Sequence, residues 1–144
     1  MIKSILSQDP LIYTIENFLK EEECEYFINN FKNNIHDAMV SGSKGGYVSS
    51  GRTGKNCWIT HDHDLTTKSI ADRISNEVDI PIINAEAFQL IFYDENQEYK
   101  QHYDSWDFDG GEKSIRNMKY GGQRLKTALV YLNEVEEGGS TRFT

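Results

Sequence analysis

Residues 121–141, which read GGQRLKTALVYLNEVEEGGST, decide the fold of this chain. The middle of this stretch, residues 125–132, is rich in large apolar and aromatic side chains and is the strongest strand signal in the sequence. A Gly-Gly pair stands on each side of it, and such pairs are typical of turns. We therefore expect a strand over 125–132, then a turn, and then a last short strand over 140–143.

The residues before this stretch also predict strands. Residues 85–93 read AEAFQLIFY and alternate in part between polar and apolar residues, as a half-buried strand does. A turn over 94–97 would lead into a paired strand over 99–104. A polar loop that contains glycine is expected over about 105–122.

The first half of the chain predicts helices instead. After a short strand over 11–18, apolar residues recur every three to four positions from Glu21 to about Ile35 and predict an amphipathic helix. A second helix is expected over 65–78, with Asp64 as its N-cap. Between them, residues 41–57 contain five glycines and predict a mobile loop with room for one strand. Helices followed by an antiparallel β region indicate an α+β fold, with helices packed on a sheet or barrel.

Length, composition and charge limit the classes of function. The chain has 144 residues, of which 38% are hydrophobic and 26% charged, so we expect one globular domain over 1–144. Its formal charge of −8, with scattered basic residues, disfavours nucleic-acid binding. No apolar run approaches the roughly 20 residues of a membrane helix. The N-terminus is too polar for a secretory signal, and the two cysteines form no CxxC pair, so we expect a cytoplasmic setting.

His102 and Asp104 are the first candidates for chemistry. In a strand, residues two positions apart point to the same face, so the imidazole and the carboxylate would converge. Such donors suit a divalent iron site of two histidines and one carboxylate. The pair alone is a weak signal, and a strand-edge histidine beside a solvated carboxylate is the alternative. His61 and His63 form a second candidate pair, for zinc, although Asp64 beside them is needed as a helix cap.

In their order along the chain, these motifs resemble the prolyl 4-hydroxylase branch of the iron(II)- and 2-oxoglutarate-dependent dioxygenases. The resemblance runs from about residue 11 to the end. It is carried by FLKEEEC at 18–24, SGRTGKNCW at 50–58, FQLIFY at 88–93, YKQHYD at 99–104 and the stretch at 121–141. It implies, within the α+β class, a double-stranded β-helix, which is a cupin-like jelly-roll barrel, with N-terminal helices that support its larger sheet.

The resemblance also implies roles for individual residues. His102 and Asp104 match two of the three iron ligands. Tyr93 and Thr141 match residues that hold the distal carboxylate of 2-oxoglutarate. The expected substrate-binding residues are Tyr99, Arg124 and Glu86 in a peptide groove and Arg52 and Trp58 in a substrate-covering loop. That loop departs from the family pattern at Gly54, where the family often has serine.

The activity implied is hydroxylation of a protein or peptide residue, with proline at C4 as the first expectation. The cofactors would be Fe(II), 2-oxoglutarate and O2, with ascorbate as reductant and with succinate and CO2 as co-products. The expected partner is a proline-containing peptide or protein, and neither nucleic acid nor a membrane. The Gly-rich stretch over 41–57 would act as a lid that excludes water from the site.

The family also has a second histidine ligand and a basic residue, usually lysine, beyond its Gly-Gly-x-Thr turn. This sequence ends three residues after Thr141. We therefore expect a domain truncated at its C-terminus relative to the family, whose incomplete barrel has open edges for self-association or strand exchange. Two ligands alone would hold iron weakly. The alternative is a catalytically incomplete fragment or pseudoenzyme of the same fold that acts as a binding or assembly module.

Overall fold

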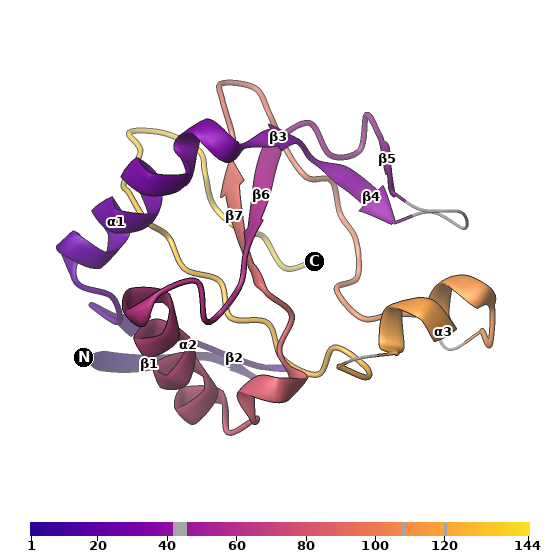
Figure 1. The fold of residues 1–144 in the computed structure, drawn as a ribbon, viewed down its shortest axis with the longest axis horizontal. Coiled ribbons are helices and arrows are strands. Elements are labelled where there is room, and N and C mark those ends of the chain that lie inside the picture. Colours follow the sequence, from indigo (N-terminus) through magenta and orange to yellow (C-terminus); the bar gives the residue numbers. More distant parts are fainter. Residues whose placement is uncertain (42–45, 108, 120) are drawn as a thin grey trace.

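The computed structural model describes residues 1–41, 46–107, 109–119 and 121–144, which adopt a mixed α/β fold with antiparallel sheets (Figure 1). The helices are α1 (Glu21–Phe31), α2 (Leu65–Val78) and α3 (Glu112–Met118), with short 3-10 helices at Lys32–Asn34 and Ile82–Asn84. The strands are β1 (Ile2–Gln8), β2 (Leu11–Glu16), β3 (His36–Asp37), β4 (Met39–Ser41), β5 (Gly46–Val48), β6 (Lys55–Ile59) and β7 (Phe88–Phe92). The α+β expectation is confirmed at this level of detail.

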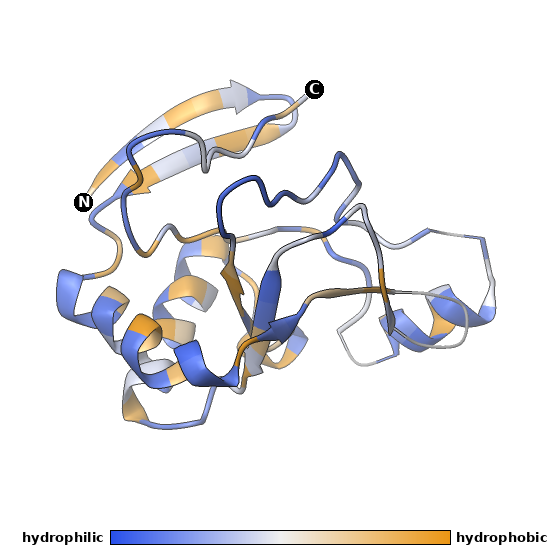
Figure 2. Ribbon diagram, turned by 90° about the horizontal axis from the view of Figure 1, so that it is seen from above, coloured by the Kyte–Doolittle hydropathy of each residue, from blue (hydrophilic) through white to orange (hydrophobic). Residues whose placement is uncertain are grey.

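The described strands pair in three groups, β1 with β2, β4 with β5, and β3 with β6 and β7 in the order β3-β6-β7. In the last group, β6 and β7 align Cys57 with Leu90 and Ile59 with Phe88. Figure 2 shows the β1–β2 hairpin as a layer of its own, set apart from β6 and β7. No helix among the described residues is long and apolar enough to cross a membrane.

The hydrophobic core lies where α1 and α2 meet β6 and β7. Phe27 and Phe31 of α1 are each 5% exposed, and Ile70 of α2 is 1% exposed. They pack with Cys57 and Ile59 of β6. Burial of one such large apolar side chain stabilises the fold by about 1.5–3 kcal/mol. The apolar spacing that predicted the two helices therefore also predicted their buried faces.

Local capping contacts set the ends of α2. The Asp64 carboxylate accepts a hydrogen bond from the Thr67 backbone N–H at 2.9 Å, and the Asp64 backbone N–H donates to the Thr67 hydroxyl at 2.9 Å. At the other end, Asp79 adopts a left-handed conformation with φ of 53°, and Pro81 follows. The expected bounds of α2 and its N-cap are confirmed, whereas α1 ends at Phe31, before the predicted Ile35.

Polar contacts join α1 to α2. Arg73 donates to both carboxylate oxygens of Glu23, at 2.6 and 3.0 Å. The Tyr26 hydroxyl donates to the Asp64 carboxylate, so the cap of α2 is also tied to α1. Burial and this hydrogen bond raise the pKa of Tyr26 to about 12.

Both loop predictions are wrong in part. The end of β4, all of β5 and the start of β6 fall within 41–57, although residues 42–45 lie outside the described part of the chain. Helix α3 falls within 105–122, where residues 108 and 120 are likewise outside the description. Its first turn is stabilised by Asp109, which accepts from the Gly111 backbone N–H at 2.9 Å and from the Ser114 hydroxyl at 2.7 Å. The hairpin partner β1 was not predicted at all.

Three strand predictions, over 99–104, 125–132 and 140–143, are also wrong. Figure 1 draws the chain from 121 to 144 as a trace without arrows. A strand requires backbone hydrogen bonds to a neighbour, and within the described residues these segments form no ladder. Tyr99 makes only an isolated bridge, with Arg52. The described residues therefore do not show the jelly-roll barrel.

Candidate functional site

The His102 ring is held on two sides. Its Nδ1 lies 2.7 Å from the Lys100 carbonyl oxygen, and its plane stacks on the Tyr99 ring with 3.6 Å between centroids. Because a carbonyl oxygen only accepts, we assign the hydrogen to Nδ1, which leaves Nε2 for another partner. A backbone carbonyl commonly orients a metal-binding imidazole in this way.

The Asp104 carboxylate faces that free nitrogen. Its Oδ1 lies 3.3 Å from His102 Nε2. Its other oxygen, Oδ2, accepts a hydrogen bond from the Thr127 hydroxyl at 2.6 Å. The structure therefore brings the two side chains together as their spacing predicted, although the segment that carries them is not a strand.

This donor pair fits two neighbouring ligands of a divalent metal. Two ligands about 2.1 Å from an ion, at right angles to each other, lie about 3 Å apart. A ring that carries its hydrogen on Nδ1 alone offers a lone pair at Nε2, so a cation between His102 and Asp104 would be bound by both side chains. Imidazole with carboxylate suits iron in particular. The described residues contain no group of three His, Cys, Asp or Glu side chains that could hold a metal.

Arg124 binds the His-x-Asp segment, residues 102–104, through a backbone carbonyl. Its guanidinium donates through two nitrogens to the Glu86 carboxylate, one of them at 2.6 Å. A third nitrogen donates to the Asp104 carbonyl oxygen at 3.2 Å, and the guanidinium lies 3.9 Å from the centroid of the Trp106 ring. The hydrogen-bonded Glu86 carboxylate raises the pKa of Arg124.

Gln123 substitutes for a missing backbone partner. Its side-chain oxygen accepts from the Trp106 backbone N–H at 2.7 Å, and its amide nitrogen donates to the Trp106 carbonyl at 2.7 Å. One amide thus satisfies both backbone groups of a residue that lies outside any strand. We call residues 123–127 the support segment, because its side chains hold residues 104–106.

Arg52 and Tyr99 extend the contacts on the other side of His102. The Arg52 guanidinium lies 4.7 Å from the centroid of the Tyr99 ring. Its side chain is only 8% exposed, and it donates to the Met39 carbonyl at 3.3 Å. The Arg52 Nε has no hydrogen-bond partner among the described residues.

Tyr93 packs against Gly54. A Cβ atom on Gly54 would lie 2.6 Å from a carbon of the Tyr93 ring, which is closer than real contacts allow. In this structure the Tyr93 ring therefore occupies the space that Gly54 leaves. Burial raises the pKa of the Tyr93 hydroxyl, while the Arg52 charge acts in the opposite direction.

Two of the predicted site residues lie apart from these contacts. Trp58 is 55% exposed and lies within β6, paired with Gln89, rather than in a loop. Thr141 is bonded to the Tyr131 hydroxyl, which accepts from its backbone N–H and donates to its side-chain oxygen. The predicted residues that the contacts link are Arg52, Tyr99, His102, Asp104, Arg124 and Glu86. Tyr93 lies against Gly54.

The zinc hypothesis gains no support from the geometry. His61 Nε2 lies 2.8 Å from the Glu86 carbonyl oxygen, and its ring packs edge-on against Phe88. The His63 ring packs edge-on against Phe31. Each of the two rings therefore has a separate packing role.

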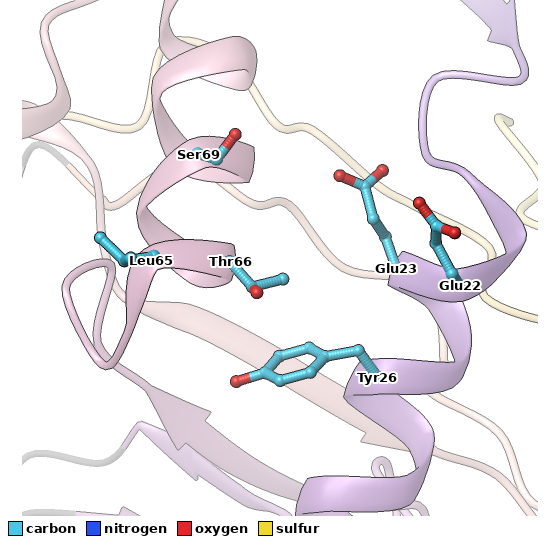
Figure 3. Close-up of a pocket in the computed structure, with 6 residues that line it drawn as sticks. All are labelled: Glu22, Glu23, Tyr26, Leu65, Thr66 and Ser69. Carbon is cyan, nitrogen blue, oxygen red and sulfur yellow. The ribbon is translucent and has the colours of Figure 1, made fainter.

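Two of the pockets on the described part of the molecule bear on the site prediction. One, of about 380 Å³, lies between α1 and α2, where the Tyr26 ring extends toward the start of α2 (Figure 3). It contains none of the predicted site residues; its lining is Glu22, Glu23, Tyr26, Leu65, Thr66 and Ser69. The other, of about 260 Å³, is lined in part by Arg52 and Gly54 and lies at the predicted substrate-covering loop.

Sequence reasoning missed Trp106, Gln123 and Thr127. In a strand, positions 124 and 127 would point to opposite faces, so the predicted strand gave no reason to place Thr127 beside Asp104. In the structure both Arg124 and Thr127 reach Asp104, one at its backbone and one at its carboxylate. The signal in the sequence was the density of polar side chains at the start of an otherwise apolar stretch.

Comparison with known proteins finds sequence similarity to prolyl 4-hydroxylases. No family model matches it. It is 36% identical over 141 residues to "Probable prolyl 4-hydroxylase 3" of Arabidopsis thaliana. This match covers 96% of this chain and 47% of that protein. It is 35% identical over 146 residues to "Prolyl 4-hydroxylase 5" of the same organism; this match covers 96% of this chain and 46% of that protein. It is 31% identical over 140 residues to "Prolyl 4-hydroxylase 2", also of that organism; this match covers 96% of this chain and 45% of that protein.

These similarities support a prolyl 4-hydroxylase-like family, and the resemblance seen in the sequence is confirmed. The chain spans about half the length of the curated relatives it matches.

Proposed function

We propose that this protein carries the iron-binding pair of an iron(II)- and 2-oxoglutarate-dependent dioxygenase that hydroxylates a protein or peptide residue. Proline at C4 is the first expectation, with succinate and CO2 as co-products. One observation carries the proposal: His102 Nε2 and Asp104 Oδ1 lie 3.3 Å apart, and each side chain is held by a further contact on its other side. The names of the relatives support the reaction class.

In this proposal, His102 and Asp104 hold the iron. With 2-oxoglutarate and O2, and with ascorbate as reductant, the bound metal supplies the oxidising chemistry that hydroxylates a C–H bond. Tyr93 donates its hydroxyl to the distal carboxylate of 2-oxoglutarate. At neutral pH that hydroxyl is protonated and therefore a donor, since burial raises its pKa above an ordinary value of 10.0 that already lies well above 7. Thr141 is the second residue proposed for this carboxylate.

The proposed substrate is a proline-containing peptide. The half-buried Tyr99 stacks on His102, and the Arg52 guanidinium lies over the Tyr99 ring, so these residues would border the place where a bound peptide brings its C–H bonds near the metal. Arg124, which donates to the Asp104 carbonyl oxygen, and Glu86, which accepts from Arg124, form the polar border of the proposed groove. Trp58 belongs to the proposed substrate surface as an exposed aromatic on β6.

We also propose that the chain forms one domain built on a double-stranded β-helix. Similarity to prolyl 4-hydroxylases over 96% of the chain supports the fold. A cytoplasmic setting is part of the proposal, because Cys24 and Cys57 are both free thiols, as a reducing compartment favours.

The test is turnover of 2-oxoglutarate by the full chain. Succinate is measured with Fe(II), ascorbate and a proline-rich peptide for the wild type, for His102→Ala and for a matched control, His36→Ala, whose side chain is exposed on β3. We expect turnover in the wild type and in the control, and none in His102→Ala. Turnover that survives His102→Ala would contradict the assignment of the site.

The alternative from a different class is a catalytically incomplete fragment or pseudoenzyme of the same fold that acts as a binding or assembly module. It predicts no succinate and no iron uptake by the wild type, together with peptide binding that is independent of iron. Isothermal titration of the same proline-rich peptide, with and without Fe(II), separates the two functions.

A further inference from the structure

We propose that Thr127 is a positioning residue: its hydroxyl fixes the orientation of the Asp104 carboxylate, so that one of the two oxygens faces His102. The inference rests on the proposed function, because it concerns the same pair of donors. The Thr127 hydroxyl donates to Asp104 Oδ2 at 2.6 Å, while Oδ1 lies 3.3 Å from His102 Nε2. One oxygen is thus held, and the other is presented to the metal.

The Asp104 carboxylate requires such a contact. The terminal torsion of an aspartate has a broad energy profile, so the side chain does not fix its own carboxylate plane. The side chain is 48% exposed, and water competes for both oxygens. Asp104 also lies outside any strand, so no backbone ladder immobilises it. A hydroxyl-to-carboxylate hydrogen bond is short and strong for its class, and 2.6 Å lies within that range.

Within the support segment, Gln123 and Arg124 bind backbone groups of residues 104–106, whereas Thr127 binds the Asp104 carboxylate. Gln123 binds both backbone groups of Trp106. Arg124 binds the Asp104 carbonyl. These bonds fix the distance between the support segment and the Asp104 backbone, so the Thr127 hydroxyl reaches the carboxylate from a defined position.

The two metal donors are then supported in the same manner. His102 is oriented by the Lys100 carbonyl through the nitrogen that does not face Asp104. Asp104 is oriented by Thr127 through the oxygen that does not face His102. Loss of an outer contact of this kind typically lowers metal affinity by about 10–100-fold, and we expect the same range for Thr127.

The test is titration of the full chain with Mn(II) alone, with free Mn(II) followed by electron paramagnetic resonance. The variants are Thr127→Val, which removes the hydroxyl at nearly constant volume, Thr127→Ala, which serves if valine disturbs folding, and Thr127→Ser, which keeps the hydroxyl. Thr14→Val, at an exposed position on β2, is the matched control. We expect Thr127→Val and Thr127→Ala to bind at least about tenfold more weakly, with Thr127→Ser and Thr14→Val close to the wild type.

The inference is overturned if Thr127→Val and Thr127→Ala bind Mn(II) as tightly as the wild type while Asp104→Ala abolishes binding. That result would leave the proposed metal pair intact. If the wild type binds no Mn(II), the proposed function fails instead, and crystal structures of the wild type and Thr127→Val decide the positioning role. A carboxylate that turns away from His102 only in the valine variant supports it, and one with the same orientation in both structures refutes it.

Discussion

The helix–sheet core and the site segment of this molecule are stabilised by different interactions. In the core, Phe27, Phe31 and Ile70 are almost fully buried, and β6 and β7 form a regular backbone ladder. In the site segment, residues 99–127, the His-x-Asp pair is exposed and is held by side-chain hydrogen bonds from the support segment. The difference implies that global stability and site geometry respond to different substitutions.

The largest expected effect is on stability, from Ile70→Ala. Ile70 is 1% exposed in the centre of the core, and removal of such a side chain leaves a cavity. We expect a loss of about 2–5 kcal/mol in the free energy of unfolding, measured by urea denaturation. Ile83→Ala, at a position that is 84% exposed, should cost little. If the folded fraction of Ile70→Ala binds Mn(II) with altered affinity, the claim that the core and the site segment respond to different substitutions is contradicted.

The next effect lies where the two regions meet, at Gly54→Ser. The new Cβ would lie 2.6 Å from the Tyr93 ring, so the ring must move, and overpacking of this kind costs about 1–3 kcal/mol. We expect weaker binding of 2-oxoglutarate, measured by isothermal titration in the presence of Mn(II). Gly51→Ala is the matched control, because its Cβ would meet only the Ser49 hydroxyl at 3.4 Å. Unchanged binding in Gly54→Ser would remove Tyr93 from the proposed cofactor site.

A smaller effect on the free energy of unfolding, confined to the core region, depends on pH. The hydrogen-bonded Arg73 guanidinium lowers the pKa of Glu23 below its ordinary value of 4.5. A lowered pKa in the folded state means that the contribution of Glu23 to stability is present above pH 4.5 and is lost as the pH falls through the folded-state value. We expect Glu23→Gln to be about 1 kcal/mol less stable than the wild type at pH 7.

Thermal unfolding of the wild type and Glu23→Gln between pH 2 and pH 7 checks this sign. The difference between the two proteins should shrink as the pH falls below the ordinary Glu value. A difference that grows toward acid would contradict the lowered pKa. Mn(II) affinity at pH 7 should be the same in both proteins, since Glu23 lies outside the site segment.

The sequence predicted those parts of the fold that depend on local interactions. Helix α2 and its cap were predicted because Asp64 and Thr67 satisfy each other within one turn. The prediction of a strand over 125–132 was wrong because a strand forms only beside a partner strand. An apolar pattern does not show whether such a partner is present among the described residues. Helix α3 was missed because its first turn depends on Asp109, which stands before two glycines that indicated a loop.

The same distinction applies to the site. The two-residue spacing predicted that His102 and Asp104 converge, and they do, although the strand on which that prediction relied does not form. The spacing was not enough to find Thr127, because regular strand geometry would have turned that side chain away from Arg124. The space that Gly54 leaves for Tyr93 could not be predicted either, because it depends on a contact between residues far apart in the sequence.

One measurement tests the central claim, that His102 and Asp104 form a metal-binding pair whose integrity is independent of the core. Mn(II) is titrated into the wild type, His102→Ala and Asp104→Ala, and urea unfolding of the three proteins is recorded alongside. We predict that the wild type binds Mn(II), that both variants lose binding, and that all three unfold at closely similar urea concentrations. Binding retained in either variant would contradict the claim.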